Sequence, residues 1–463
     1  MSDRGSTLGH SSALFDPLVA AGPVAERVGD GAWFRAMLDF ESALAAAQAD
    51  AGLIDRRHAE RIAAVCGEAD LGDYDVVALG RAAMGAGNPA APLVRALTER
   101  VEEVDGGAAR YVHWGATSQD VVDTAAMLVA ARARVPLLSD VAACAEKLAE
   151  LAAEHASIVQ VARTLSQHAL PTTFGLVAAG WLSSLGAAAD RLRAVRLPVQ
   201  LGGAVGTLAS LGESGTEVSA ALATRLGLEE PTLPWHTDRT PVAELAGALG
   251  GLAGAVSGVA RSIVTLAQTD IGEVAESGPP GSGGSSTMPH KRNPVAAVSA
   301  LACAKQAPGL VADLLAAMEH ENQRASGAWH AEWWPLIQLW RVCGSAVHWL
   351  RTSLERLRVD AGRMRENLDR SGGVLLAERI TTELAPVVGR LAAHDAVTEC
   401  CRRALDEGAS LAKVLADDPL VGAHLSRERI DQLLDPAGYL GAAPVFVERA
   451  LEEYRGRQEE PCG

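Results

Sequence analysis

The chain has 463 residues, of which 48% are hydrophobic and only 4% aromatic, so it is long enough for about two to four domains with a large core. Ala, Leu and Val recur at helical spacing, which predicts an all-α protein with little extended structure. The formal net charge of −16 opposes binding to nucleic acid, anionic membranes and anionic small molecules. We therefore expect no nucleic-acid partner and no membrane partner, and any anion site must be locally basic.

The seven cysteines are scattered through helical patterns, without a CxxC pair or a His/Cys ligand spacing. This pattern indicates reduced thiols and no structural zinc. The N-terminus shows no basic region followed by an apolar one, and Arg, Asp or Glu interrupts each apolar stretch before it reaches membrane-spanning length. We expect a cytoplasmic protein.

Helical patterns fill the N-terminal part of the chain. The first runs from about residue 32 to 51, and others lie around 58–66 and 74–98. Asn88-Pro89 marks a turn that interrupts the last of these. We expect residues 1–110 to form an N-terminal helical domain.

Longer helical patterns follow, over about 121–155, 171–195, 241–274, 295–319 and 331–357. Their length and their many small residues suit close packing in a bundle, so we expect residues 111–358 to form a central long-helix bundle. Pro171 is expected to begin the second of these helices. Beyond about residue 359 the helices become shorter and the charge denser, which predicts a small C-terminal helical domain over 359–463.

Four polar segments interrupt or precede these helices, at residues 113–120, 163–173, 234–239 and 281–294. Each combines hydroxyl or amide groups with cationic or imidazole groups, so together they suit one anion site at the end of a bundle. The alternative is four unrelated caps and turns. In the first segment, for example, a helix N-terminus explains Thr117 and Ser118 as caps, and it equally offers N–H groups to a carboxylate.

The segment at 281–294 is the most distinctive of the four. It places glycines, serines and cations between long apolar helices, which is typical of a mobile active-site lid. A plain Gly/Ser linker is the alternative, but such a linker gives no reason for the sequence MPHKRNP at its end.

Residues 284–294 (GSSTMPHKRNP) are similar to the GSSxMPxKxNP signature of the fumarase/aspartase superfamily, and residues 113–120 and 163–173 resemble its two other shared regions. Within the superfamily, the chain most resembles the carboxymuconate cycloisomerases. Further segments carry that likeness, which spans roughly residues 15–380: 37–44 (MLDFESAL), 112–120 (VHWGATSQD), 233–239 (LPWHTDR) and 327–333 (GAWHAEW).

The resemblance implies a fold and an assembly. The expected fold is all-α, with three helical domains around a central long-helix bundle. The expected partner is a second copy of the chain, in a homotetramer whose active sites are shared between subunits, and the expected substrate is a small polycarboxylate.

The resemblance also implies residue roles. Ser285 corresponds to the carbon acid/base, and Lys291 to a catalytic cation that supports it. This support matters because a serine hydroxyl is a weak base whose alkoxide must be stabilised by loop N–H groups and a neighbouring ammonium. Substrate-binding roles fall to His113, Thr117, Ser118, Thr164, Gln167, His236, Arg239 and Asn293, although His113 equally suits a buried hydrogen-bonding role.

Two positions depart from the wider superfamily. Many hydratases and ammonia or amine lyases have His after the Arg-Thr of the second region and Glu seven positions after the signature lysine, where this chain has Leu165 and Val298. That His–Glu pair helps a leaving group to gain a proton. Its loss favours a leaving group that is a weak base, such as a carboxylate.

These features predict a cycloisomerase that closes a carboxymuconate to a lactone without a metal or organic cofactor. A nitrite-releasing lyase of the nitrosuccinate type is the alternative, since nitrite is also a weak base. A non-catalytic relative, like the superfamily's lens proteins, is disfavoured by the intact Ser285, Lys291 and Asn293. A serine hydrolase is disfavoured because Ser285 lies in no GxSxG motif.

Overall fold

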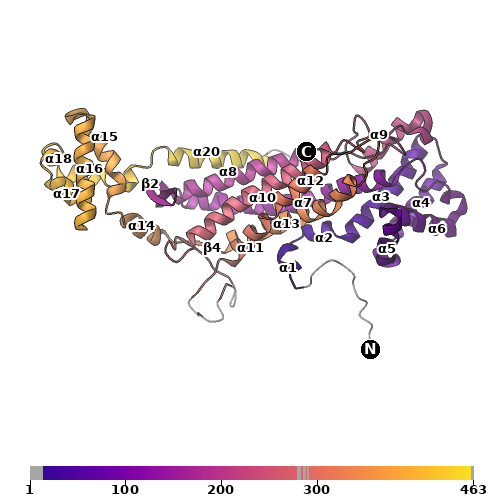
Figure 1. Ribbon diagram of the computed structural model, residues 1–463, viewed down its shortest axis with the longest axis horizontal. Coiled ribbons are helices and arrows are strands. Elements are labelled where there is room, and N and C mark those ends of the chain that lie inside the picture. The colour runs from indigo at the N-terminus through magenta and orange to yellow at the C-terminus, as the bar shows by residue number, and fades with distance from the viewer. Residues whose placement is uncertain (1–13, 279–282, 285–287, 289–290, 460–463) are drawn as a thin grey trace. The chain divides into compact units, whose positions relative to one another are not determined.

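The computed structural model describes residues 14–278, 283–284, 288 and 291–459 (Figure 1). Over these residues the chain is mainly helical, which confirms the predicted fold class. It divides into two compact units, which are described separately. Unit 1 is built from Met1–Val141, Ala188–Ser257 and Ser299–Trp349, and unit 2 from Ala142–Ala187, Gly258–Val298 and Leu350–Gly463. Because long helices pass from one unit to the other, neither unit coincides with a predicted domain, and the three-domain division stays a prediction.

Unit 1 contains the N-terminal helices and large parts of the long ones. Its elements are α1 (Asp16–Val19), α2 (Val24–Arg27), α3 (Asp30–Asp50), α4 (Arg56–Glu68), η1 (Leu71–Asp73), α5 (Val76–Ala86), α6 (Ala90–Ala109), η2 (Ala209–Ser214), α9 (Gly215–Leu226), α12 (Ala307–Ala316), and parts of α7 (Ser118–Glu154), α8 (Phe174–Arg193), α10 (Thr240–Leu266), α11 (Val295–Ala304) and α13 (Ala328–Arg356).

The N-terminal helices form where the apolar periodicity predicted them. Helix α3 contacts α4 and α9, and its core face includes the fully buried Leu38 and Phe40. The predicted break in the third helix separates α5 from α6, where the Asn88 side chain accepts a hydrogen bond from Ala91 N at 3.0 Å. This short polar side chain satisfies a backbone donor at the start of α6, as capping residues do.

Unit 2 contains the other ends of the long helices, two small sheets and the C-terminal helices. Its own elements are β1 (Val159–Thr164), β2 (Gln167–Thr173), β3 (Val274–Glu276), β4 (Leu357–Val359), α14 (Ala361–Asp369), η3 (Val374–Leu376), α15 (Ala377–Val388), α16 (Arg390–Glu407), α17 (Leu411–Asp417), α18 (Pro419–His424), α19 (Arg427–Leu433), η4 (Pro436–Gly438) and α20 (Ala443–Glu459).

The polar segment at 163–173 lies in an antiparallel hairpin of β1 and β2, with Thr164 paired to Gln167. The two residues of the turn, Leu165 and Ser166, have φ of 50° and 64°, as in the turns that match the twist of a hairpin. The prediction that a helix begins at Pro171 was wrong, since Pro171 lies in β2 and α8 begins at Phe174. The alternating Val159 and Val161 of β1 favour a strand, and Pro171 is paired with Val161 in the resulting hairpin.

Helices α15 to α19 enclose a hydrophobic core of their own, which includes the buried Ile380, Leu384, Val397, Leu415 and Ile430. Short amphipathic helices that share one core are typical of a small helical domain. The described part of the predicted C-terminal domain therefore has the core that such a domain needs.

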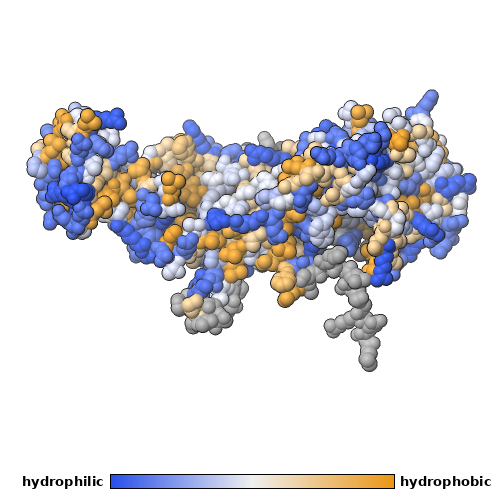
Figure 2. All heavy atoms as spheres, in the orientation of Figure 1, coloured by the Kyte–Doolittle hydropathy of each residue, from blue (hydrophilic) through white to orange (hydrophobic). Residues whose placement is uncertain are grey.

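Two stretches are long and apolar enough to cross a membrane by length and composition, α10 and the range Val295–Ala316 that includes α11 and α12. Each contains two charged residues, Glu244 and Arg261 in α10 and Lys305 and Asp313 in the second stretch. Within unit 1, α10 buries Leu245, Leu249 and Leu252, as the core helix of a globular protein does. Figure 2 shows that apolar side chains also reach the visible surface over the long helices.

Candidate functional site

The start of α7 is fixed by a reciprocal cap. Asp120 in the first turn accepts a hydrogen bond from Thr117 N at 3.0 Å, while Thr117 O accepts one from Asp120 N at 2.9 Å. The contact of the Asp120 side chain with Thr117 N is one half of a capping box. The side chains of Thr117 and Ser118 are half-buried, and no hydrogen bond of either hydroxyl is found within the part of the chain that the structure describes. Both hydroxyls are therefore available to a ligand.

The carboxylate of Asp120 also binds the glycine-rich segment that follows α8. It accepts hydrogen bonds from Gly202 N and Gly203 N, each at 3.0 Å. A Cβ on Gly202 would lie 2.6 Å from Cε1 of His236, so only glycine lets the imidazole approach the backbone this closely. Gly202 and Gly203 thus hold a buried carboxylate, and Gly202 leaves room for a histidine.

His236 completes the environment of Asp120. Its Nε2 lies 2.6 Å from Oδ1 of Asp120, and the residue is only 4% exposed. Its carbonyl oxygen accepts a hydrogen bond from the Gln119 side chain at 2.8 Å. The histidine of the LPWHTDR segment is therefore held on both its ring and its backbone by α7.

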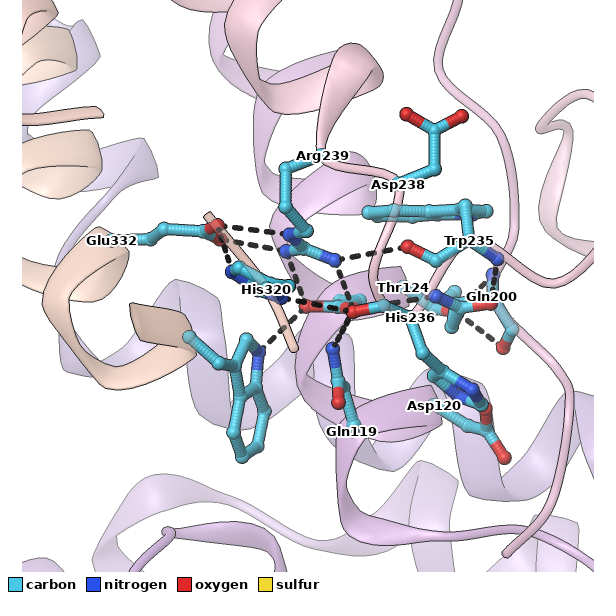
Figure 3. A network of polar contacts seen from close by, with 12 residues as sticks. Gln119, Asp120, Thr124, Gln200, Trp235, His236, Asp238, Arg239, His320 and Glu332 are labelled. Carbon is cyan, nitrogen blue, oxygen red and sulfur yellow. Dashed lines mark hydrogen bonds and ion pairs between the residues drawn. The ribbon is translucent and has the colours of Figure 1, made fainter. Parts of the chain in front are cut away.

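Arg239 lies between two carboxylates on different helices (Figure 3). Its guanidinium donates to Asp123 at 2.8 and 3.0 Å, and to Glu332 of α13 at 2.7 and 2.9 Å. Nη1 also donates to Trp235 O, so Nε, Nη1 and Nη2 all have partners. Burial opposes the charge, but the two carboxylates outweigh it and raise the pKa of Arg239. This side chain is 2% exposed, and in this arrangement it is a structural cation with no donor left for a substrate carboxylate.

A second arginine links the same elements. Arg324 donates to the Gln119 side chain at 2.8 Å and to Gly203 O at 2.6 Å. Gln119 in turn donates to Asp123 at 3.1 Å. His320 lies against the same segment, with Nδ1 3.3 Å from His236 O. Charged and amide side chains therefore surround His236 from several directions, and their fixed partners make the site rigid.

His113 lies just before α7 and has a partner of its own. Its Nδ1 lies 2.7 Å from Oε1 of Glu41, a residue of α3 that is only 1% exposed. Burial of the ring opposes protonation, but the charge of Glu41 and its hydrogen bond outweigh burial and raise the pKa of His113. The buried hydrogen-bonding role considered for His113 is thus present in the structure.

Thr164 and Gln167 lie in unit 2, at the tip of the β1–β2 hairpin, and both are exposed. Leu165 between them is 98% exposed. Arg163, at the base of the same tip, donates to the buried Glu273 at 2.6 and 3.0 Å, so it serves the hairpin rather than a ligand. The tip thus exposes two polar side chains, Thr164 and Gln167, and the apolar side chain of Leu165.

The described parts of the signature segment also belong to unit 2. Asn293 donates to Gly283 O from its backbone N at 2.8 Å and from Nδ2 at 3.1 Å, which closes the base of the segment. Gly283 has φ of 69°, and a Cβ there would lie 2.5 Å from Asn293 O. Glu276, before the segment, accepts hydrogen bonds from Ala296 N and Ala297 N at the start of α11. Lys291 is exposed, and Ser285 lies outside the described residues.

The structure thus brings the predicted site residues together in two groups. His236 and Arg239 lie close to the cap that holds Thr117 and Ser118, all in unit 1, where His113 pairs separately with Glu41. Unit 2 carries Thr164, Gln167, Lys291 and Asn293. Within the described ranges, no group of three or more His, Cys, Asp or Glu side chains is arranged to hold a metal ion.

Sequence reasoning did not identify the contacts of several residues that organise unit 1: Glu41, Gln119, Asp120, Asp123, Gly202, Gly203, Arg324 and Glu332. A signal existed for three of them. Glu41, Asp120 and Glu332 stand inside the segments MLDFESAL, VHWGATSQD and GAWHAEW, and a charged residue in an otherwise apolar helix often has a buried partner.

Comparison with known proteins decides the family. Residues 19–309 match the family model described as Lyase, and residues 373–450 match that described as adenylosuccinate lyase C-terminus. A 3-carboxy-cis,cis-muconate cycloisomerase of Pseudomonas aeruginosa is 46% identical over 97% of this chain and 98% of its own. The chain belongs to the fumarase/aspartase superfamily of lyases. This confirms the superfamily recognised in the signature segment, and with it that the protein is an enzyme.

Two further relatives of this lyase define the choice of activity. A nitrosuccinate lyase of Streptomyces davaonensis is 44% identical over 95% of this chain and 94% of its own. The crystal structure of 3-carboxy-cis,cis-muconate lactonizing enzyme from Pseudomonas putida matches with a TM-score of 0.90 and 42% identity, and the match covers 96% of this lyase and all of that chain. The fold is therefore that of the lactonizing enzyme.

Proposed function

We propose that the protein is a cycloisomerase that converts 3-carboxy-cis,cis-muconate to a carboxymuconolactone, in the catabolism of protocatechuate through β-ketoadipate. The observation that carries this proposal is the likeness of the chain, in sequence and in fold, to the lactonizing enzyme of Pseudomonas putida. Leu165, which is 98% exposed at the tip of the hairpin, agrees with it. The superfamily members that protonate a leaving group have a histidine here. An apolar side chain transfers no proton, so the tip suits a reaction in which no leaving group needs one.

The substrate, Ser285 and solvent supply every atom and electron of the proposed step. An oxygen of one substrate carboxylate forms a C–O bond to the double bond, whose electron pair moves to the carbon beside another carboxylate. Ser285 donates its hydroxyl proton to that carbon and regains a proton from solvent. In the reverse direction the leaving group is a carboxylate, which departs without a general acid.

Charge on the intermediate has to be stabilised locally. The enolate carries negative charge on its own carboxylate in addition to the other carboxylates of the substrate, while the chain has a net charge of −16. We propose Lys291 as the cation beside Ser285, since an ammonium there supports both the serine alkoxide and the enolate. Its exposed side chain at the end of the signature segment is free to reach such a position by loop closure.

The remaining predicted residues are proposed to hold the substrate. Thr117, Ser118, Thr164 and Gln167 offer hydroxyl and amide groups, His113 and His236 offer imidazoles, and Asn293 fixes the base of the loop. Arg239 is proposed to act through its ion pairs rather than by contact with the substrate. No metal or organic cofactor is needed by this step, and we propose that the reaction takes place in the cytoplasm.

Two copies or more are proposed to complete the site, as a homotetramer. One face of α10 carries Gly247, Gly251, Gly254 and Gly258, where an added Cβ would meet nothing within 4 Å. Glycines in the middle of a helix cost stability, and a row of them lets a second helix approach closely. A long apolar helix with such a face suits packing against another subunit.

A nitrosuccinate lyase is the second candidate, because the relative with that name is 44% identical to this chain, close to the 46% of a cycloisomerase. Nitrite, like a carboxylate, leaves without a proton. The apolar Leu165 therefore fits both reactions, and the substrate must distinguish them.

Parallel assays with the purified protein separate the two candidates. One follows the ultraviolet absorbance of 3-carboxy-cis,cis-muconate, and the other follows fumarate and nitrite released from nitrosuccinate. We expect rapid loss of the muconate absorbance and a kcat/KM for nitrosuccinate at least about 10²-fold lower. Preference for nitrosuccinate would replace the cycloisomerase by the lyase, and activity on neither substrate would refute both candidates.

A further inference from the structure

We propose that Asp120 positions His236 so that the imidazole donates a hydrogen bond from Nδ1 to the enolate of the substrate. The inference rests on the proposed function for the identity of that enolate. His236, rather than Arg239, then binds the negative charge of the substrate in unit 1. Arg239 is the stronger cation, but its role is structural.

Asp120 is built as an anchor. The residue is fully buried, and its two oxygens accept hydrogen bonds from Thr117 N, Gly202 N and Gly203 N in addition to the contact with His236. Three backbone donors fix the carboxylate in place before any ligand arrives. A carboxylate held in this way fixes both the tautomer and the orientation of a histidine bonded to it.

The imidazole has one nitrogen engaged and one nitrogen without a partner. Nε2 lies 2.6 Å from Asp120, whereas no bond of Nδ1 is found among the described residues. The side chain is 95% buried, and Nδ1 is the ring nitrogen that remains for a ligand. With Nε2–H directed at Asp120, the imidazolium form presents Nδ1–H as a donor.

The charged groups around His236 allow its imidazole to bind the enolate. Asp120 and Asp123 of α7 and Glu332 of α13 are negative, while Arg239 and Arg324 are positive and Asp238 lies on the exposed side of the segment. His320 contacts the backbone of His236 through Nδ1. Arg239 is shared between Asp123 and Glu332, so Asp120 is the carboxylate that faces the His236 ring directly.

The comparison between His236 and Arg239 decides which of them binds the substrate. Every nitrogen of the Arg239 guanidinium donates to a carboxylate or to Trp235 O. Turning it toward a ligand would leave Asp123 and Glu332 buried without a counter-charge, which is strongly unfavourable. His236 needs no such rearrangement, because its second nitrogen is unused.

The kinetic test compares wild type with His236→Gln, Asp120→Asn and the double variant on the muconate. Loss of an enolate donor lowers kcat by about 10²- to 10³-fold with KM changed by less than about 3-fold. Asp120→Asn is expected to lower kcat by roughly 10²-fold or more, and the double variant to match His236→Gln. Asp238→Asn is the matched control, since it removes a charge two residues from His236 without touching its ring, and it should retain full activity.

Losses that multiply in the double variant would overturn the positioning role of Asp120, and a changed KM with unchanged kcat would overturn the enolate contact. If Asp120→Asn does not fold, Gly202→Ala replaces it, because the added Cβ would lie 2.6 Å from Cε1 of His236 and displace the ring from Asp120.

A spectroscopic readout is independent of the substrate. In imidazole ¹H–¹⁵N spectra of the full-length labelled protein, the signal absent from His236→Gln identifies His236. We expect an Nε2–H signal that shifts in Asp120→Asn and not in Asp238→Asn. An unshifted signal would show that Asp120 and His236 do not form a hydrogen-bonded pair. A shifted signal from a protein that turns over neither substrate would refute only the proposed function.

Discussion

Nδ1 of His113 lies 2.7 Å from Oε1 of Glu41, a residue 72 positions earlier in the chain. The pair joins the N-terminal helix α3 to the segment that leads into α7. The pKa of His113 is raised, because the charge of Glu41 and its hydrogen bond outweigh the effect of burial.

This raised pKa predicts how stability depends on pH. The stabilisation by the protonated ring is fully present below the unfolded value, for which 6.5 is the ordinary pKa, and is lost as pH rises through the raised folded value. We expect the thermal unfolding midpoint of wild type to exceed that of Glu41→Gln most at about pH 6, and the difference to shrink toward pH 8.5. A difference that stays constant with pH would show that the pair does not titrate in this range.

Replacement of Arg239 is predicted to destabilise the fold. Arg239→Gln leaves Asp123 and Glu332 buried without their partner, so the free energy of unfolding should fall by about 3–5 kcal/mol. Arg196→Gln is the control, because Arg196 pairs with Glu229 at the exposed surface and such pairs contribute little to stability. Urea unfolding of both variants checks this. Equal, small losses, with only KM raised in Arg239→Gln, would instead make Arg239 a substrate ligand.

The base of the signature segment is predicted to depend on Gly283. Its φ of 69° is unfavourable for a residue with a side chain, and a Cβ would lie 2.5 Å from Asn293 O. We expect Gly283→Ala to lower kcat by about 10²-fold through misplacement of the catalytic loop, with little change in the unfolding midpoint. In Gly67→Ala, where an added Cβ meets nothing within 4 Å, kcat should be unchanged. A fully active Gly283→Ala enzyme would mean that this contact does not position the loop.

Helices could be predicted from the sequence better than the hairpin could. The apolar spacing around Leu38 and Phe40 gave the position of α3, whereas β1 and β2 were missed. Leu165 in the turn carries no turn signal, because leucine is disfavoured at positive φ, and Pro171 misleadingly suggested a helix start.

The candidate site could be predicted in part. Motifs identified His236 and Arg239, but not the partners that distinguish their roles. Asp123 lies 116 positions before Arg239 and Glu332 lies 93 positions after it. Local spacing carries no information on contacts at such separation, since these depend on how the long helices pack. Apolar periodicity shows which face of a helix is buried, but it does not show which charged residue on a neighbouring helix will lie opposite.

Assembly through α10 is predicted to need its glycine face. Gly251→Leu places a bulky side chain on an exposed surface where an added Cβ meets nothing within 4 Å, so a single chain should tolerate it. Packing of a second helix against that face should not, because a side chain there keeps two helix backbones apart. Light scattering after gel filtration should show a smaller species for Gly251→Leu, with Gly67→Leu unchanged. An unaltered assembly would exclude this face from the interface.

The proposed function requires that the enzyme close 3-carboxy-cis,cis-muconate with Ser285 as the carbon acid. The most direct measurement follows the reaction in D₂O by ¹H NMR, with wild type and Ser285→Ala side by side. We predict that wild type forms a carboxymuconolactone carrying one deuterium on the carbon beside a carboxylate, and that Ser285→Ala is slower by about 10²- to 10⁴-fold. Near wild-type turnover in Ser285→Ala would rule out Ser285 as the carbon acid, and no lactone from wild type would rule out the cycloisomerase.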